Sequence, residues 1–404
     1  MPAQAYSVLT HEAIIDTAWE KHIKPLLQAR YPGATDEDLT GAHAYAYAGC
    51  IIQDMGYYPF GSHFFSDLLH YVRSGDFVVN LIQDAQNLDE YAFALGAMAH
   101  YAADIEGHSI AVNHSVPIEY PKLRDRYGNV VTYEDNPTDH LKVEFGFDVL
   151  QVARGNYAPQ AYHNFIGFKV SKPVLERAFR DTYGLEMKDI FNDLDLSLGT
   201  FRRAVGSVIP EMTRVAWDIK KKDLQKARPG VTRRQFVYRL SDASYHQQWD
   251  SKYHKPGPEA FMLSLLIRVI PKVGPFKTLA FKAPTPETER LFEQSFDRTL
   301  DRYDRLLAAQ GAGVLQLANM DLDTGRPTKP DEYRMADDAY GKLAVKLAAK
   351  DPDAINPEVR ENIVAFFAEL HQPFRTSENP KQWAETVAAV AKLKAQGTAS
   401  RVQQ

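Results

Sequence analysis

The stretch AMAHYAADIEGHSIAVNH, residues 97–114, carries His100, Asp104 and His108 at intervals of four residues within an apolar run. Positions four apart in an α-helix lie almost above one another on one face. The pattern therefore predicts an apolar helix with three polar side chains on one side. Because buried polar groups need partners, these side chains must contact other polar groups, water or a metal ion.

The overall composition is that of a globular protein. The chain has 404 residues, of which 45% are hydrophobic and 25% charged, and its net charge of -5 gives no electrostatic signature for duplex nucleic acid. The single cysteine, Cys50, excludes an internal disulfide and a cysteine-rich zinc site, and we interpret it as a core residue. No apolar run is long enough to predict a transmembrane segment.

The sequence around the opening stretch predicts an all-α protein. Periodic apolar residues separated by turns rich in Gly and Pro indicate helices at 7–30, 36–52, 63–73, 76–86, 88–113 and 138–153. Further helices are expected at 172–184, 196–227, 258–271, 285–310, 331–349, 357–370 and 380–395. Two segments are expected to be loops: 116–137, with a short hairpin near Tyr127–Asn129, and 321–330, DLDTGRPTKP.

Other side chains that could bind a metal are concentrated in the N-terminal part. Ten of the 13 histidines precede residue 164. His140 and Glu144 repeat the four-residue spacing, and His11, Asp54 and His70 lie on or near neighbouring predicted helices. This asymmetry suggests chemistry in the N-terminal part and a structural or substrate-shaping role for the rest.

The spacing of the opening motif limits how a metal could bind it. His100 and His108 are about 12 Å apart along a helix, whereas metal–ligand bonds are about 2.0–2.2 Å long, so one ion cannot bind both. Two or three ions could, with Asp104 as a bridge. Nitrogen and oxygen ligands suit catalytic zinc, and also manganese or iron. Histidines outside these spacings are interpreted mostly as ordinary core or surface residues, namely His22, His43, His63, His114 and His163. His63 is the main exception, as a residue that supports a ligand or contacts a phosphate.

Eight side chains together resemble the metal site of the zinc-dependent phospholipase C family. Relatives of that family include single-strand-specific nucleases and the catalytic part of glycosylphosphatidylinositol-specific phospholipase D, and the segments AHYAADIEGHS and LLHYV are most similar to the latter. The eight residues are His11, Asp54, His70, His100, Asp104, His108, His140 and Glu144. The resemblance covers residues 6–165 and implies an α-helical fold with three zinc ions at the bottom of a cleft.

Carried over residue by residue, the resemblance implies three groups of ligands. One zinc would be held by Asp54, His70, His100 and Asp104, and a second by His108, His140 and Glu144. The third would be held by His11, Asp104 and the amine and carbonyl of the mature N-terminal residue. The triplet Ala3-Gln4-Ala5 looks like the end of a signal peptide, so this residue would be Tyr6, and the protein would be periplasmic or secreted.

The function that the resemblance implies is phosphodiester hydrolysis by a metal-activated water, with Asp54 orienting or deprotonating that water, or serving only as a ligand. We expect a phospholipase C that acts on phospholipid headgroups and contacts membranes peripherally. Tyr57, His63 and Trp249, the last within the aromatic-rich segment 244–258, are expected to contact the substrate. Two alternatives stay open: a single-strand-specific nuclease with the same zinc site, and a non-catalytic zinc-binding helical protein.

The expected organisation has two parts. Residues 6–200 would form the catalytic region, and residues 201–404 would form a helical C-terminal region that packs on the same core and shapes the cleft.

Overall fold

The computed structural model of the protein describes residues 8–154, 168–205, 281–369, 373–377 and 379–402. Within these ranges the chain is almost entirely helical, which confirms the predicted all-α class. The helix predicted at 258–271, most of the one predicted at 196–227, and the residues Tyr6 and Trp249 lie outside the described residues.

The N-terminal helices follow one another closely along the chain. They are α1 (Val8–Ala18), α2 (Lys24–Arg30), α3 (Asp36–Gly49), α4 (His63–Tyr71), α5 (Ser74–Asp84), α6 (Leu88–Glu106), α7 (Asn113–Glu119), α8 (Pro121–Tyr127) and α9 (Pro137–Arg154). Two π-helical turns, Trp19–Ile23 and Gly107–Val112, and one 3-10 helix, Ile52–Tyr57, lie between them.

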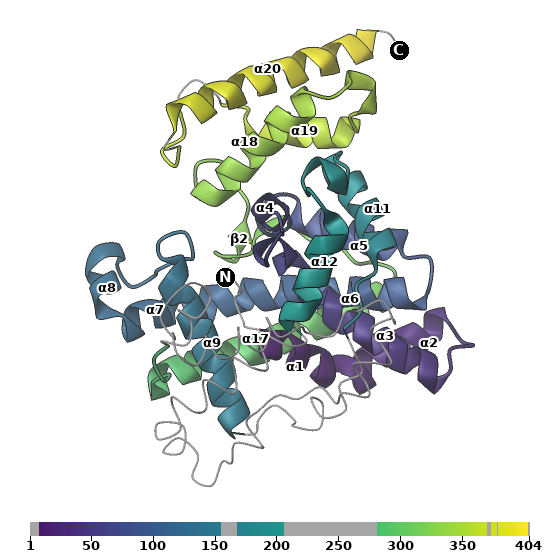
Figure 1. Ribbon diagram of the computed structural model, residues 1–404, viewed down its shortest axis with the longest axis vertical. Helices are drawn as coiled ribbons and strands as arrows, with labels where there is room; N and C mark the ends of the chain where they lie inside the picture. Colours follow the sequence, from purple (N-terminus) through teal and green to yellow (C-terminus); the bar gives the residue numbers. More distant parts are fainter. Residues whose placement is uncertain (1–7, 155–167, 206–280, 370–372, 378, 403–404) are drawn as a thin grey trace, which may run out of the picture.

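The later elements are again mostly helices. They are α11 (Lys172–Tyr183), a 3-10 helix (Met187–Asp189), α12 (Leu194–Arg203), α17 (Pro286–Gly311), β1 (Met320–Asp321), β2 (Arg326–Pro327), α18 (Arg334–Ala348), a 3-10 helix (Pro352–Ala354), α19 (Pro357–Phe366) and α20 (Pro380–Val402). The helices α18, α19 and α20 lie together at one end of the molecule, and α18 also packs against α4 (Figure 1). None of the described helices is both long and apolar enough to span a bilayer.

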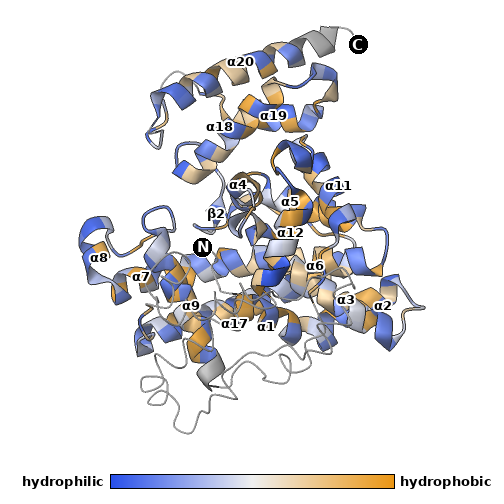
Figure 2. Ribbon diagram, in the orientation of Figure 1, coloured by the Kyte–Doolittle hydropathy of each residue, from blue (hydrophilic) through white to orange (hydrophobic). Residues whose placement is uncertain are grey.

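The helix α6 lies at the centre of the described fold. Asn87 begins it by accepting a hydrogen bond from the backbone amide of Glu90, and every residue from Glu90 to Glu106 is buried. This complete burial arises because α1, α3, α5 and α17 all pack against α6. Figure 2 shows the hydrophobic stretches of α1, α3 and α17 gathered in this part of the molecule, whereas α20 alternates between hydrophobic and hydrophilic residues.

Two glycines allow α3 and α6 to pack backbone against backbone. A Cβ atom on Gly96 would lie 2.2 Å from the carbonyl oxygen of Ala46, and one on Gly49 would lie 2.0 Å from that of Phe93. Neither helix could keep this separation with a side chain at those positions. The close contact matters for the site, because α6 carries His100 and the residue after α3, Cys50, contacts it.

We expect Gly96→Ala to lower the free energy of unfolding by about 3 kcal/mol, the upper end of the usual cost of overpacking a core, because backbone atoms would have to move apart. Gly41→Ala on α3 is the matched control: its Cβ would meet nothing within 4 Å. Since Ala favours helix over Gly, the control should raise stability by up to about 1 kcal/mol. Urea denaturation of metal-free protein measures both, and equal effects would contradict this packing.

The expected loop at 116–137 is wrong over its first half. The helix α7 continues to Glu119, and α8 begins at Pro121, which suits the first turn of a helix because its φ is already helical and its missing N–H is not needed there. Pro117 cannot donate to the carbonyl of Asn113, and the backbone amide of Val131 donates to that oxygen instead, at 2.9 Å. No hairpin forms near Tyr127–Asn129 in this described stretch.

The expected loop at 321–330 is instead part of a hairpin. The strands β1 and β2 pair antiparallel, with Met320 opposite Pro327 and Asp321 opposite Arg326. The carboxylate of Asp321 accepts hydrogen bonds from the backbone amides of Asp323 and Thr324, and Gly325 supplies the positive φ of 68° that closes the turn. The hairpin docks beside α4, where the amide of Leu322 donates to the carbonyl of His70 at 3.1 Å.

Candidate metal centre

The structure brings the eight predicted side chains into three groups that could each hold a metal ion. The groups are His11–His100–Asp104, Asp54–His70–His100, and His108–His140–Glu144. Within each group the potential ligand atoms lie within 4.8 Å of one another, and every side chain is buried.

The first two groups meet at His100 and Asp104. Asp104 Oδ2 lies 3.1 Å from His100 Nε2 and 3.3 Å from His70 Nε2, while its Oδ1 lies 3.6 Å from His11 Nε2. The Nε2 atoms of His70 and His100 are 3.4 Å apart. Two nitrogens bound to one tetrahedral zinc at about 2.0–2.1 Å are separated by about 3.3–3.4 Å, so this spacing suits a shared ion. Asp104 lies between the groups, as a bridging carboxylate would.

Backbone carbonyls fix the orientation of the two shared histidines. His100 Nδ1 lies 3.0 Å from the carbonyl oxygen of Cys50, and His70 Nδ1 lies 2.8 Å from that of Ser66. A carbonyl oxygen only accepts hydrogen bonds, so each Nδ1 carries the proton. The Nε2 atoms are therefore left as lone-pair donors that face Asp104.

His11 reaches the site because the start of α1 is anchored by α9. The carboxylate of Asp148, on α9, accepts hydrogen bonds from the backbone amides of Leu9 and Thr10 at 3.0 and 3.1 Å. These amides belong to the first turn of α1, where the helix itself offers no acceptor. The ring of His11 then stacks on that of His100, with centroids 4.6 Å apart.

The third group forms because the opening motif does not stay on one regular helix face. The helix α6 ends at Glu106, and His108 lies in the π-helical turn Gly107–Val112, which contains more residues per turn than an α-helix. The ring of His108 meets that of His140 edge to face at 5.1 Å, and its Nε2 lies 3.9 Å from Glu144 Oε1. The predicted helix over 88–113 is therefore helical throughout, but its π-helical turn gives His108 a different direction from a regular α-helix.

His140 and Glu144 stand one turn apart on α9. His140 Nδ1 lies 2.7 Å from Glu144 Oε1, a hydrogen-bond distance. Two ligands of one zinc would stand about half an ångström further apart than this, so a small separation of the pair would admit the ion.

Sequence reasoning missed two side chains that hold the third group. Asp323 Oδ1, from the β1–β2 hairpin, lies 2.9 Å from His108 Nδ1. Asn113 Oδ1 lies 2.8 Å from His140 Nε2, and Asn113 Nδ2 donates to the backbone carbonyl of Asp323 at 2.7 Å. The only signal in the sequence was the Asp-x-Asp-x-Gly pattern of 321–325, which is typical of a tight turn.

The charges around His11 and Asp104 suit metal binding. Burial, together with the neighbouring His100, lowers the pKa of His11 to about 3, which keeps this imidazole neutral. Burial would raise the pKa of Asp104, but His100 and His70 outweigh it and hold that pKa well below its usual value. A neutral imidazole and an ionised carboxylate are the protonation states that bind a metal.

Buried carboxylates that face only histidines give the clearest sign that the residues fit a cation. Asp54 and Asp104 are fully buried, and the groups that face their oxygens are the Nε2 atoms of neighbouring histidines. Burial of an ionised carboxylate with so few donors is costly, and a bound divalent cation would remove that cost. The donor set of histidines and carboxylates, without sulfur, is one that zinc accepts.

Of the three side chains predicted to contact substrate, the structure describes Tyr57 and His63, while Trp249 lies outside the described residues. Tyr57, at the end of the 3-10 helix, packs between His63 and His70, with ring centroids 5.5 and 5.9 Å away, and its buried hydroxyl has no partner among the described residues. His63 begins α4 at the surface, so His70 rather than His63 lies among the potential ligands. His43, interpreted as ordinary, stacks on Trp19 away from the three groups.

Comparison with known proteins gives one result. A sequence model of the family "Zinc dependent phospholipase C" matches residues 10–193, a range that includes all eight of the grouped side chains. No curated protein and no solved structure matched the chain. Asp323 and the whole β1–β2 hairpin lie outside the matched range.

Proposed function

We propose, because residues 10–193 match the sequence model of the zinc-dependent phospholipase C family, that this chain acts as a member of that family and hydrolyses the phosphodiester of phospholipid headgroups with three zinc ions. The observation that carries the proposal is the pair of buried carboxylates, Asp54 and Asp104, whose oxygens face the imidazole nitrogens of three histidines. Such a site is built for cations.

The proposed ligands combine these groups with the family resemblance. The third group, His108, His140 and Glu144, would hold one ion as it stands. The resemblance divides the other side chains into Asp54, His70, His100 and Asp104 for a second ion, and His11 and Asp104 with the mature N-terminal residue Tyr6 for a third. Bound zinc supplies positive charge for the phosphoryl oxygens and lowers the pKa of a coordinated water toward about 7. Export to the periplasm or outside the cell, after cleavage before Tyr6, is part of the same proposal.

Asp54 is the residue proposed to orient the attacking water and take its proton. Its Oδ1 lies 3.4 Å from His70 Nε2, and its other oxygen is free of hydrogen bonds from the described residues. In the metal-free protein, burial raises the pKa of the Asp54 carboxyl above its ordinary value. The hydroxyl of Tyr57 is proposed to donate to a phosphoryl oxygen of the substrate, because it is buried beside His70 and has no described acceptor.

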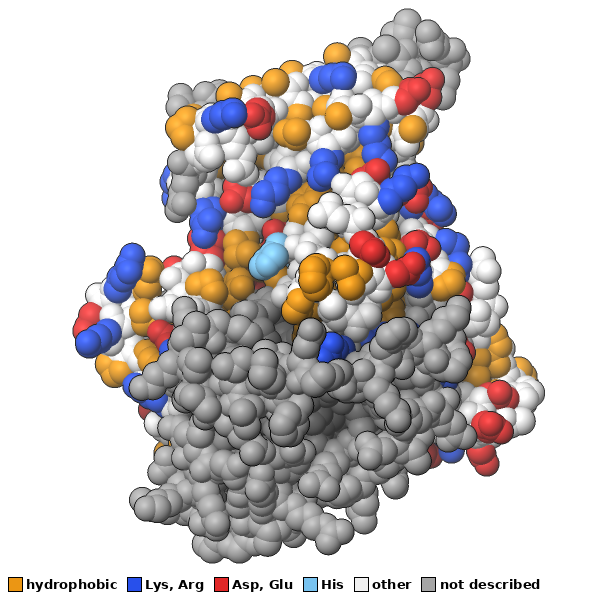
Figure 3. All heavy atoms as spheres, viewed as in Figure 1, with side chains coloured by type: hydrophobic (Ala, Val, Ile, Leu, Met, Phe, Trp, Pro, Cys, Tyr) orange, Lys and Arg blue, Asp and Glu red, His pale blue; other side chains and the backbone are white. Residues whose placement is uncertain are grey.

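An exposed apolar loop near these residues supports a lipid substrate. Phe60, between Tyr57 and His63, is 68% exposed and adopts a positive φ of 65°, which non-glycine residues rarely do. Ser197 on α12 holds the loop by donating to the Phe60 carbonyl at 2.6 Å, and Leu196 beside it is also exposed. Figure 3 shows hydrophobic side chains gathered over α12. A lipid surface is the partner that would cover such side chains.

A substrate panel before and after chelation tests the function. We expect protein that begins at Tyr6 to release phosphorylated headgroup and diacylglycerol from phosphatidylcholine vesicles, to lose this activity with 1,10-phenanthroline, and to regain it with added zinc. Cleavage of single-stranded DNA in preference to the vesicles would favour the nuclease, and bound zinc without any hydrolysis would favour a binding protein. His22→Ala, a surface histidine, is the control variant and should keep full activity.

A further inference from the structure

We propose that Asp323, from the hairpin outside the family-matched range, is a positioning residue for the His108–His140–Glu144 metal group. This inference rests on the proposed function, and it deepens it by giving the C-terminal part of the chain a role in zinc binding. Asp323 is fully buried. Its side chain lies against His108, and its backbone carbonyl binds Asn113, which in turn contacts His140.

The side chain of Asp323 acts on His108. Its Oδ1 lies 2.9 Å from His108 Nδ1, so a proton on Nδ1 is favoured and the lone pair is left on Nε2, the nitrogen that faces Glu144. A carboxylate behind a ligand histidine fixes the orientation of the ring and makes its other nitrogen a stronger donor to a metal.

The backbone of Asp323 acts on His140 through Asn113. The Asp323 carbonyl accepts a hydrogen bond from Asn113 Nδ2, which turns Asn113 Oδ1 toward His140 Nε2. An amide oxygen only accepts, so Asn113 favours the proton on His140 Nε2, and a cation bound at this group would then take the lone pair of Nδ1 beside Glu144. The same residue thereby sets the tautomers of both histidines in the group.

Asp323 is itself held in place from the opposite side. Its Oδ2 accepts hydrogen bonds from the hydroxyls of Tyr71 at 2.8 Å and Tyr333 at 2.6 Å. Tyr71 follows the potential ligand His70, and Tyr333 precedes α18, so these contacts join the hairpin to α4 and to the C-terminal helices. The two hydroxyls hold Oδ2, while Oδ1 faces His108 Nδ1 at ion-pair distance, so the side chain has one defined position.

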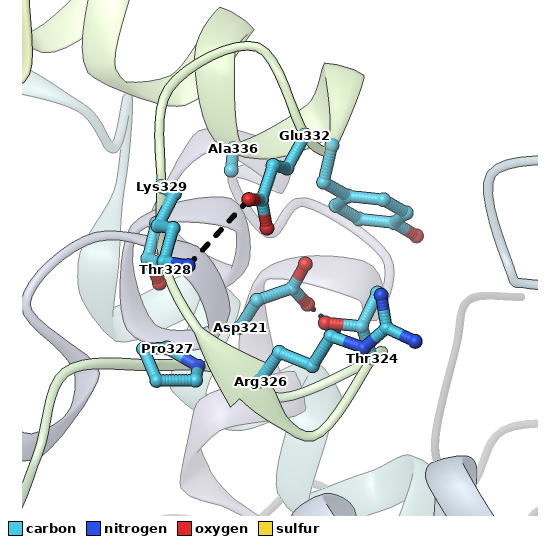
Figure 4. Close-up of a pocket in the computed structure, with 9 residues that line it drawn as sticks. Asp321, Thr324, Arg326, Pro327, Thr328, Lys329, Glu332 and Ala336 are labelled. Carbon is cyan, nitrogen blue, oxygen red and sulfur yellow. Dashed lines mark hydrogen bonds and ion pairs between the residues drawn. The ribbon is translucent and has the colours of Figure 1, made fainter.

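The neighbouring Asp321 offers a matched control on the same hairpin. Its carboxylate accepts from two backbone amides and from the side chain of Thr324, all within the turn, and lies toward a small cavity of about 40 Å³ lined also by Lys329 and Glu332 (Figure 4). An asparagine oxygen at position 321 can accept the same two amides. Asp321→Asn should therefore keep the hairpin and leave the metal group untouched.

The test compares zinc binding by the full chain and by its Asp323→Asn and Asp321→Asn variants in buffers of fixed free zinc. We expect Asp323→Asn to bind one ion per chain about 10–100-fold more weakly than the parent, with the remaining zinc unchanged. Cobalt(II) substitution should show the loss of one absorption component in this variant only. The temperature at which half of the metal-free protein is unfolded separates a positioning role from a structural one. A purely structural role of Asp323 would lower this temperature in Asp323→Asn and leave its zinc affinity unchanged.

Equal zinc affinity in Asp323→Asn and the parent, or equal losses in both variants, would overturn the inference. If Asp323→Asn does not fold, Tyr333→Phe removes one of the hydrogen bonds that hold Asp323, and it should weaken the same ion at least threefold; an unchanged affinity would then overturn the proposal. A parent protein that binds no zinc would instead defeat the proposed function, so the two failures are distinguishable.

Discussion

Replacement of Asp104 by asparagine is expected to reduce phosphodiester hydrolysis at least about a thousandfold and to release at least one zinc ion per chain. Asp104 is the carboxylate that faces three histidines at once, with His100, His70 and His11 at 3.1, 3.3 and 3.6 Å. Asparagine keeps the shape but removes the negative charge, and its amide nitrogen cannot bind a metal. Two ions would therefore lose a shared ligand in one substitution.

The measurement is the steady-state rate on a soluble phosphodiester, together with zinc per chain by elemental analysis. Asp89→Asn, a partly buried carboxylate in the first turn of the same helix, is the control and should retain both values. A variant Asp104→Asn with full zinc content and more than a tenth of the parent rate would show that this carboxylate is not a ligand.

Glu144→Gln is expected to have the second largest effect, a loss of about 100-fold or more in rate with the release of a single zinc ion. Glu144 is the only carboxylate in the third group, where it lies 2.7 Å from His140 Nδ1 and 3.9 Å from His108 Nε2. The ions held around Asp104 should stay, because the two sets share no ligand.

Asp139→Asn is the matched control on α9, since this carboxylate pairs with Lys142 at 2.7 Å in the first turn of the helix. It should keep the parent's rate and zinc content. Release of every zinc ion from Glu144→Gln would argue against separable groups, and retention of every ion would argue that Glu144 is not a ligand.

Local spacing in the sequence predicted much of the site. Residues four apart on a helix share a face, and this placed His100 with Asp104 and His140 with Glu144, as the structure has them. The same rule was wrong in detail for His108, because the π-helical turn after Glu106 changes the direction of its side chain. Periodicity of apolar residues does not reveal where such a turn occurs.

Contacts between distant segments could not be predicted from the single sequence. Asp323 lies 215 residues after His108, and the turn in which it occurs has the same local pattern as many surface turns. Its role depends on the packing of the hairpin against α4, which no local pattern encodes. The segment 116–137, expected to be a loop, is a similar case. The carbonyl of Asn113, to which Pro117 cannot donate, accepts a hydrogen bond from the amide of Val131, 18 residues further along the chain.

Zinc analysis of the purified protein tests the central claim most directly. Elemental analysis combined with zinc X-ray absorption spectroscopy counts the ions and identifies their ligand atoms. We predict three zinc ions in protein that begins at Tyr6, and two in protein that begins at Met1, all with nitrogen and oxygen ligands at about 2.0–2.2 Å and no sulfur. One zinc ion or none per chain, or a sulfur ligand at about 2.3 Å, would contradict the proposed metal centre.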